Sequence, residues 1–160
     1  MSTISKLTPA QHEANARTIY AFWRGVELSH AVACGFVANA DAESSLDPTL
    51  VGDNGKAVGL HQWHGDRRIL IRDGGQGYKG CGIDVATQTD LLDQLKAAWW
   101  ELQNSEHHAL AMIKKAISPY DAGATICRLY ERSGLADQPA KRGARAKVWD
   151  VFFTTQTLGA

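Results

Sequence analysis

Hydrophobic side chains recur at helical spacing along most of the chain. The clearest stripe consists of Leu91, Leu95, Ala98 and Leu102. Because such steps place side chains on one face of an α-helix, they predict a helix over residues 85–104. Similar patterns predict five more helices, over residues 9–24, 30–43, 106–117, 122–132 and 139–153. The chain is therefore expected to be mainly helical.

Capping residues support several of these boundaries. Thr8, Pro9 and Gln11 form a hydroxyl N-cap, a first-position proline and a capping-box amide at the start of the first helix. Ser29 is expected to cap the second helix and Asp121 the fifth. The last helix is expected to turn three side chains toward the core: Val148, Trp149 and Phe152.

Glycine dominates residues 52–82, where nine of the fifteen glycines lie and where neither a helical nor a long alternating pattern continues. Short hairpin strands are expected around residues 58–63, in an otherwise irregular insert after the second helix. With 160 residues and 44% hydrophobic content, the chain is long enough for one core and too short for two. A single domain over residues 1–160 is expected.

Charge and cysteine content exclude several classes of protein. Seventeen basic and seventeen acidic residues cancel, which argues against nucleic acid as a partner. No stretch reaches the ~18 apolar residues of a membrane span, and residues 1–9 lack the apolar core of a signal peptide. Cys34, Cys81 and Cys127 are spaced like neither a disulfide framework nor a four-thiolate zinc site, so buried free thiols are expected.

Glu43 is the most informative polar residue. Helical steps back from it meet Ala40, Asn39 and Phe36, so its carboxyl shares the face that should point toward the core. Burial at the edge of a cleft raises a carboxyl pKa toward neutrality, as a general acid for a glycosidic oxygen requires. The structural alternative is a glutamate at a helix end that faces solvent or pairs with an arginine.

Two segments carry a resemblance to a known family. AESSLDPTLVGDNGKAVGLHQWHGDRR (residues 42–68) resembles the core motif of phage tail lysozymes and related phage endolysins. LYERSGLADQPAKRGARAKVW (residues 129–149) resembles their Tyr-Glu-Arg segment and arginine-containing last helix. The motif order is more distantly similar to goose-type lysozymes and soluble lytic transglycosylases. The resemblance implies a mainly α, lysozyme-like α+β fold: a helical bundle with a small glycine-rich hairpin insert after the second helix.

The resemblance also implies roles for particular residues. Glu43 would be the catalytic acid, and Gln62 and Trp63 would line the glycan cleft. Asp53 is our choice for a second carboxylate, although a turn-forming role in the glycine loop is an equal alternative. Asp47 and Asp66 are weaker rivals, since the first should shape a turn and the second can pair with a neighbouring arginine.

Three further residues are grouped with the substrate-binding set: Ser44, Tyr130 and Glu131. Ser44 is expected to hold the end of the second helix through local hydrogen bonds. Tyr130 would stack against the substrate or donate to it, and Glu131 would orient a loop through an arginine. Purely structural roles fit Tyr130 and Glu131 equally well.

The implied activity is hydrolysis of the β-1,4 bond between N-acetylmuramic acid and N-acetylglucosamine in peptidoglycan. Two alternatives stay open: a lytic transglycosylase that uses the same Glu43, and a weakly active binding module of a phage tail. No metal or organic cofactor is expected. The expected partners are glycan strands and phage tail proteins, and the free chain is expected to be a monomer. Synthesis in the host cytoplasm and action at the periplasmic wall, as an endolysin or a tail component, are implied.

Other patterns offer competing chemistry. His61 and His64, together with residues 107–108, could be zinc ligands of an amidase, but exposed loop histidines are the expected interpretation. Trp99 and Trp100 are expected to pack on the core. The basic residues of segment 141–147 either contact an anionic wall polymer or form the solvated face of the last helix.

Overall fold

The computed structural model describes residues 4–158, and within that range the chain forms seven α-helices and two short antiparallel hairpins. The helices are α1 (Pro9–Gly25), α2 (His30–Ser44), α3 (Gly65–Asp73), α4 (Leu91–Gln103), α5 (His107–Ile113), α6 (Pro119–Ile126) and α7 (Gln138–Leu158). The expected mainly helical, lysozyme-like fold with a small hairpin insert is confirmed. Residues 1–3, part of the stretch in which no signal peptide is expected, lie outside the described residues.

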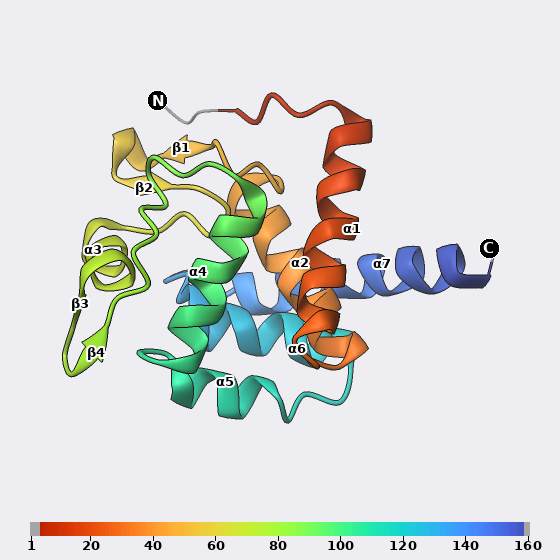
Figure 1. The fold of residues 1–160 in the computed structure, drawn as a ribbon. Helices are drawn as coiled ribbons and strands as arrows, with labels where there is room; N and C mark the ends of the chain where they lie inside the picture. The colour runs from red at the N-terminus through yellow and green to blue at the C-terminus, as the bar shows by residue number, and fades with distance from the viewer. Residues whose placement is uncertain (1–3, 159–160) are drawn as a thin grey trace.

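Helix α2 forms the centre of the bundle, with α1, α6 and α7 packed around it (Figure 1). Its small side chains allow this close approach. A Cβ atom on Gly35 would lie 2.9 Å from the backbone of Ala122 in α6, and one on Gly123 would lie 2.6 Å from the carbonyl oxygen of Arg142 in α7. The glycines therefore bring these three helices together at the point from which α2 runs on toward Glu43.

The predicted starts of the first two helices are confirmed. The Thr8 side chain accepts from the backbone N–H of Gln11, and the Gln11 side chain accepts from that of Thr8, which completes a capping box. Ser29 caps α2 by accepting from the N–H of Val32. These hydrogen bonds satisfy backbone donors that have no partner inside a helix.

The glycine-rich insert contains more regular structure than its sequence indicates. Strands β1 (Val51–Gly52) and β2 (Ala57–Val58) flank the 3₁₀ turn η1 (Asp53–Gly55), and β3 (Gly74–Gly75) pairs with β4 (Tyr78–Lys79). Helix α3, between the hairpins, corrects the expectation of an irregular segment. Only Ile71 of α3 is buried, so the helix presents no apolar stripe in the sequence.

Several boundaries in the second half of the chain differ from expectation. Helix α4 begins after Asp90, whose side chain accepts from two backbone N–H groups, and not at residue 85. Ser118, not Asp121, caps α6, and this helix continues into a π-helical turn, η2 (Cys127–Glu131). On α7, Val148 is 68% exposed although it was expected to point inward. Its neighbour Trp149 is buried, and consecutive helical residues point in different directions.

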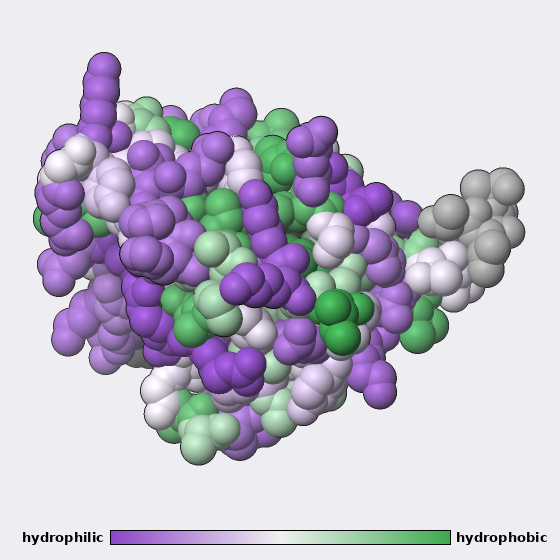
Figure 2. Space-filling view, turned by 90° about the horizontal axis from the view of Figure 1, so that it is seen from below, coloured by the Kyte–Doolittle hydropathy of each residue, from purple (hydrophilic) through white to green (hydrophobic). Residues whose placement is uncertain are grey.

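The three cysteines are free thiols, as expected, but only Cys34 and Cys127 are buried; Cys81 lies on the surface just after β4. No helix in the described part of the chain has the length and hydrophobicity that a membrane crossing requires. The face in Figure 2 is largely hydrophilic, and its hydrophobic residues show as separate patches.

Candidate active site

A cleft of about 840 Å³ lies where α2 ends. The first hairpin and the loop leading into α3 form one wall, and η2, the loop after it and the start of α7 form the other. The lining includes Glu43, Asp53, His61, Gln62, Glu131 and Arg142. Segments far apart in the sequence therefore converge on one hollow.

Glu43 lies in the last turn of α2, and its side chain is 20% exposed to this cleft. Its Oε1 accepts a hydrogen bond from Nη2 of Arg142 at 2.9 Å, and Arg142 is nearly buried. Burial raises the pKa of Glu43, and the negative charge of Glu131 raises it further. Arg142 and His61 act in the opposite direction, but the pKa remains above its ordinary value. This carboxyl is thus biased toward its protonated form despite the arginine.

His61 and Glu131 form a buried pair beside Glu43. Nδ1 of His61 lies 2.6 Å from Oε1 of Glu131, with 0% and 1% of the two side chains exposed. The expectation that His61 is an exposed loop histidine is wrong, because the loop turns inward and the ring meets Phe36, Trp63 and Tyr130 edge to face. Nε2 of His61 is buried without a hydrogen-bond partner among the described residues. His64, in contrast, is exposed.

A second buried carboxylate, Glu101 of α4, explains the positions of Trp63 and Tyr130. Its Oε2 accepts from Nε1 of Trp63 at 2.7 Å and from the hydroxyl of Tyr130 at 2.8 Å. Arg67 of α3 donates to both of its oxygens, at 2.8 and 2.9 Å. Burial and the charge of Glu101 raise the pKa of Tyr130 well above its usual value.

This network corrects the expected placement of two aromatic residues. Trp63 and Tyr130 have no exposed surface, and neither side chain lines the cleft. The physical reason is that their polar atoms are matched to Glu101 inside the core, where an unpaired donor or acceptor would be costly. They support the wall of the cleft from behind.

Gln62 and Asp53 do line the cleft. The amide nitrogen of Gln62 donates to the carbonyl oxygens of Leu50 and Gly59. These bonds hold the loop around Gln62 against the two ends of the first hairpin. Asp53 lies in the η1 turn with a side chain that is 55% exposed, and its Oδ2 is 4.0 Å from Nδ1 of His64. Asp53 is therefore an accessible carboxylate on the hairpin side of the cleft.

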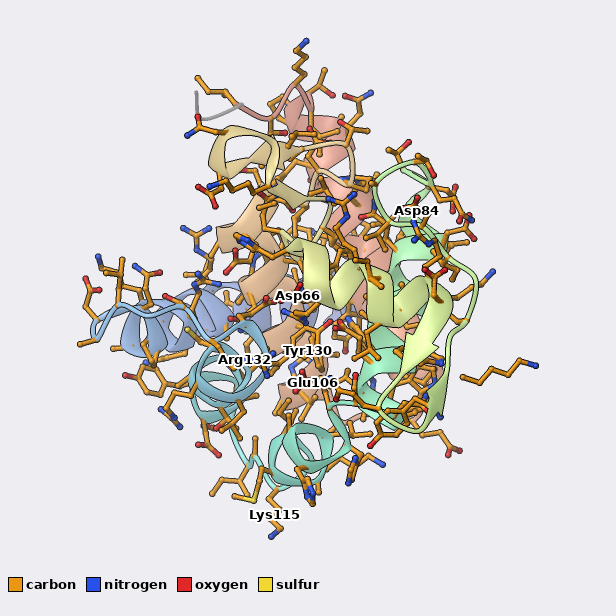
Figure 3. All side chains as sticks on the ribbon, turned by 90° about the vertical axis from the view of Figure 1, so that its left-hand side faces the viewer. Asp66, Asp84, Glu106, Lys115, Tyr130 and Arg132 are labelled. Atoms are coloured by element: carbon orange, nitrogen blue, oxygen red, sulfur yellow. The ribbon has the colours of Figure 1, made fainter. Side chains whose placement is uncertain are left out.

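Ser44 is buried and does not face the cleft. Its hydroxyl lies within hydrogen-bond distance of two backbone carbonyl oxygens, Ala40 at 3.1 Å and Leu60 at 2.9 Å. This is the local role expected for it, and it fastens the end of α2 to the insert. The remaining rivals to Asp53 are not in the cleft lining. Asp47 accepts from Thr49 and Ser5, and these bonds lower its pKa against the effect of burial, while Asp66 is exposed in the first turn of α3 (Figure 3).

The opposite rim is held by an ion pair. Arg132 follows η2 and donates to both carboxylate oxygens of Glu106, at 2.9 and 3.0 Å. Figure 3 labels the two residues close to each other and to Tyr130. Arg132 also lines the cleft, so this ion pair holds part of the rim near η2.

Two contributors to the site were missed in the sequence. Glu101 was not singled out, because nothing around it in α4 indicates a buried acid. Arg142 lies in the basic segment 141–147, for which a wall-binding or solvated face was expected. It is instead 5% exposed and paired with Glu43. The arginine-containing last helix of the resemblance was the one available signal for it.

Comparison with known proteins agrees with the resemblance of the two sequence segments. A model of the phage tail lysozyme family matches residues 14–153. A search of curated proteins found no match. The family match includes α2, the insert, η2 and most of α7, which are the elements that line the cleft. The chain belongs to the phage tail lysozyme family, which supports a lysozyme-like role in the breakdown of peptidoglycan.

Proposed function

We propose that this protein cleaves the β-1,4 bond between N-acetylmuramic acid and N-acetylglucosamine in peptidoglycan, with Glu43 as general acid. The observation that carries the proposal is the combination of cleft exposure and raised pKa at Glu43. A general acid must hold its proton near the working pH and reach the leaving oxygen. A buried carboxyl without access to a cleft would meet only the first requirement.

Arg142 has an orienting role in this mechanism. Its hydrogen bond goes to Oε1 of Glu43, which leaves Oε2 as the oxygen that carries the proton. Arg142 by itself favours the carboxylate, whereas burial and Glu131 favour the neutral acid. A glycan in the cleft displaces water from the remaining exposed surface of Glu43, which strengthens the preference for the neutral acid.

Glu131 is assigned a positioning role through its charge. Its carboxyl is held by His61 at 2.6 Å and does not need to touch the substrate. Because two nearby carboxyls resist double ionisation, negative charge on Glu131 keeps the proton on Glu43. His61 holds the carboxyl of Glu131 in place at the wall of the cleft.

The chemical step begins when Glu43 donates its proton to the oxygen that leaves C1 of N-acetylmuramic acid. The C1–O bond breaks, and positive charge develops on the sugar ring. In the hydrolytic reaction a water adds to C1 and loses its proton to Asp53, the accessible carboxylate of the cleft. Water addition yields a reducing end.

The lytic transglycosylase reaction is the second candidate. Here the substrate's own C6 hydroxyl attacks C1 and gives its proton to the Glu43 carboxylate left by the first proton transfer, which yields an anhydro end, so no second carboxylate is needed. This outcome is favoured by the exposure of Asp53, whose side chain is 55% exposed and whose Oδ2 lies 4.0 Å from Nδ1 of His64. Asp53→Asn distinguishes the two, since it should impair hydrolysis and leave transglycosylation intact.

The proposed partners are glycan strands and, by the name of the family, proteins of a phage tail. We propose synthesis in the host cytoplasm and action at the periplasmic wall, as a tail-associated lysozyme or as an endolysin. A monomer is proposed for the free chain.

The test is clearance of outer-membrane-permeabilised Gram-negative cells by wild type and Glu43→Gln. Loss of the general acid should lower activity by roughly 10²–10⁴-fold. Glu13→Gln, at an exposed position of α1, is the matched control and should keep full activity. Equal clearance by wild type and Glu43→Gln would remove Glu43 from the mechanism. No clearance by wild type would favour a binding module. Mass spectrometry of the muropeptides distinguishes reducing from anhydro ends.

A further inference from the structure

A cluster of three metal-ligating side chains lies outside the cleft. His30 and Cys34 come from the first half of α2, and Asp150 comes from α7. Their donor atoms all lie within 4.8 Å of one another. We propose that His30, Cys34 and Asp150 bind one divalent transition-metal ion of the zinc class, which links α2 to α7.

The spacing of the donors suits a tetrahedral ion. His30 and Cys34 are four residues apart on one helical face, and Sγ of Cys34 lies 3.7 Å from Nε2 of His30. Zinc–nitrogen and zinc–sulfur bonds of about 2.0 and 2.3 Å, at the tetrahedral angle, separate these atoms by about 3.5 Å. Nε2 of His30 is 2.7 Å from Oδ1 of Asp150. That distance must open to about 3.3 Å to admit the ion. Both side chains are more than a third exposed and have room for this adjustment.

Neighbouring groups orient the proposed ligands. The hydroxyl of Tyr20, on α1, lies 2.8 Å from Nδ1 of His30. It can accept a hydrogen bond from an Nδ1–H of His30, which leaves the Nε2 lone pair for the ion, as outer partners of metal-binding histidines do. Thr154 donates to Oδ1 of Asp150 at 3.3 Å. The proposed site thus has outer partners on both α1 and α7.

The charges of the cluster fit a divalent cation. Asp150 and a Cys34 thiolate together supply two negative charges, and Arg24 of α1 is the cation nearby. Without an ion, burial and the charge of Asp150 raise the pKa of Cys34 to about 12, so the sulfur is a thiol. Binding therefore replaces one proton, which leaves Cys34 for solvent as the metal–sulfur bond forms. The ion takes the Nε2 lone pair of His30, so the bound imidazole is the neutral tautomer with its proton on Nδ1.

The cluster is separate from the proposed active site, since none of its three residues lines the cleft. Solvent reaches it through the exposed parts of His30 and Asp150, while Cys34 is buried. A water would complete the four-coordinate site. The ion would stabilise the fold and take no part in glycan cleavage.

The test is titration of Co²⁺ into the reduced, chelator-treated full chain. We expect a near-ultraviolet sulfur-to-cobalt charge-transfer band that saturates at one ion per chain and disappears when Zn²⁺ displaces the cobalt. Cys34→Ser should abolish the band, and Cys127→Ser, at the other buried cysteine, should keep it. A band that is absent from wild type, or that survives in Cys34→Ser, overturns the proposal.

A second pair of variants keeps the test decisive if Cys34→Ser fails to fold. Asp150→Asn should weaken binding at least about tenfold. The matched control is Asp41→Asn, because Asp41 pairs with His12 at 2.9 Å in a similar way without belonging to the cluster. The affinity of Asp41→Asn for Co²⁺ should equal that of wild type. Equal affinity of Asp150→Asn and wild type contradicts the site.

Discussion

Nδ1 of His61 and Oε1 of Glu131 lie 2.6 Å apart beneath the cleft, and both side chains are closed to solvent. The contact joins the glycine-rich insert to η2 across 70 residues of sequence. Because electrostatic interactions are strong in an apolar surrounding, the pair can influence Glu43 without touching the substrate. Four predictions follow from this pair and the groups around it.

Glu131→Gln should make the enzyme more sensitive to alkaline pH. Negative charge on Glu131 raises the pKa of Glu43, so its removal lowers that pKa. The protonated fraction of Glu43 then falls at a lower pH, and the alkaline limb of kcat/KM against pH moves in the same direction. Wall-clearance rates across the pH range measure this, with Glu13→Gln as the control. An alkaline limb that stays in place would show that Glu131 does not act on Glu43.

Arg142→Met should shift the same limb in the opposite direction. Arg142 lowers the pKa of Glu43, so its loss raises that pKa further and extends the protonated form to higher pH. The maximal rate should nevertheless fall several-fold, because Oε1 of Glu43 loses the hydrogen bond that orients the carboxyl. Arg142→Lys keeps the charge and should restore the pH profile more than the rate. Movement of the limb to lower pH would contradict this assignment.

Ionisation of Glu43 should lower the free energy of unfolding as pH rises. Its pKa is higher in the folded than in the unfolded chain, so the folded chain binds more protons between the two values. The free energy of unfolding of wild type should therefore fall relative to Glu43→Gln as pH increases through the unfolded value, about 4.3. Urea denaturation of both proteins at pH 4 and pH 7 gives the difference. A gap that is the same at both pH values would rule out the raised pKa.

The hydrogen-bond network around Glu101 should stabilise the fold and should not contribute to substrate binding. Glu101→Gln leaves Arg67 without its buried carboxylate and should lower the free energy of unfolding by about 3–5 kcal/mol. Tyr130→Phe removes one hydrogen bond to the carboxylate and should cost about 1.5–3 kcal/mol.

A measurement of KM distinguishes this structural role of Tyr130 from the substrate-binding role that the sequence analysis expected. Trp63 and Tyr130 are absent from the cleft lining, so Tyr130→Phe should leave KM for soluble glycan fragments unchanged. Trp100→Phe serves as the stability control, because it removes an indole N–H that donates to the carbonyl oxygen of Lys79 from a partly buried side chain outside the cleft. A large rise in KM for Tyr130→Phe would return Tyr130 to the substrate-binding set.

The sequence predicted the elements whose signals are local. The capping residues of α1 and α2 and the helical face of Glu43 lie within a few positions of the structure they determine. Helix α3 was missed because a single buried residue, Ile71, gives no periodic pattern. The start of α4 was placed too early because it was set at the apolar pair Val85 and Ala86, whereas three polar residues separate this pair from the Asp90 cap.

The site was harder to predict because its pairs connect distant segments. A tryptophan in a glycine-rich loop is typical of a sugar-binding surface, which is why Trp63 was placed in the cleft. The hydrogen-bond partner that buries its indole is Glu101, 38 residues away. His61 looked exposed for the same reason, since nothing near it in the chain indicates Glu131. The position of Glu43 could be inferred from its helix alone, whereas Arg142 depended on how α7 packs on α2.

The hydrogen bond from Ser44 to the carbonyl oxygen of Leu60 has a mechanical consequence. It joins the residue that follows Glu43 to the loop that carries His61 and Gln62. Any displacement of this loop should therefore also displace Glu43. A cross-linked strand that pushes against the insert should in this way shift the general acid, whereas the opposite wall is anchored separately by the ion pair between Arg132 and Glu106.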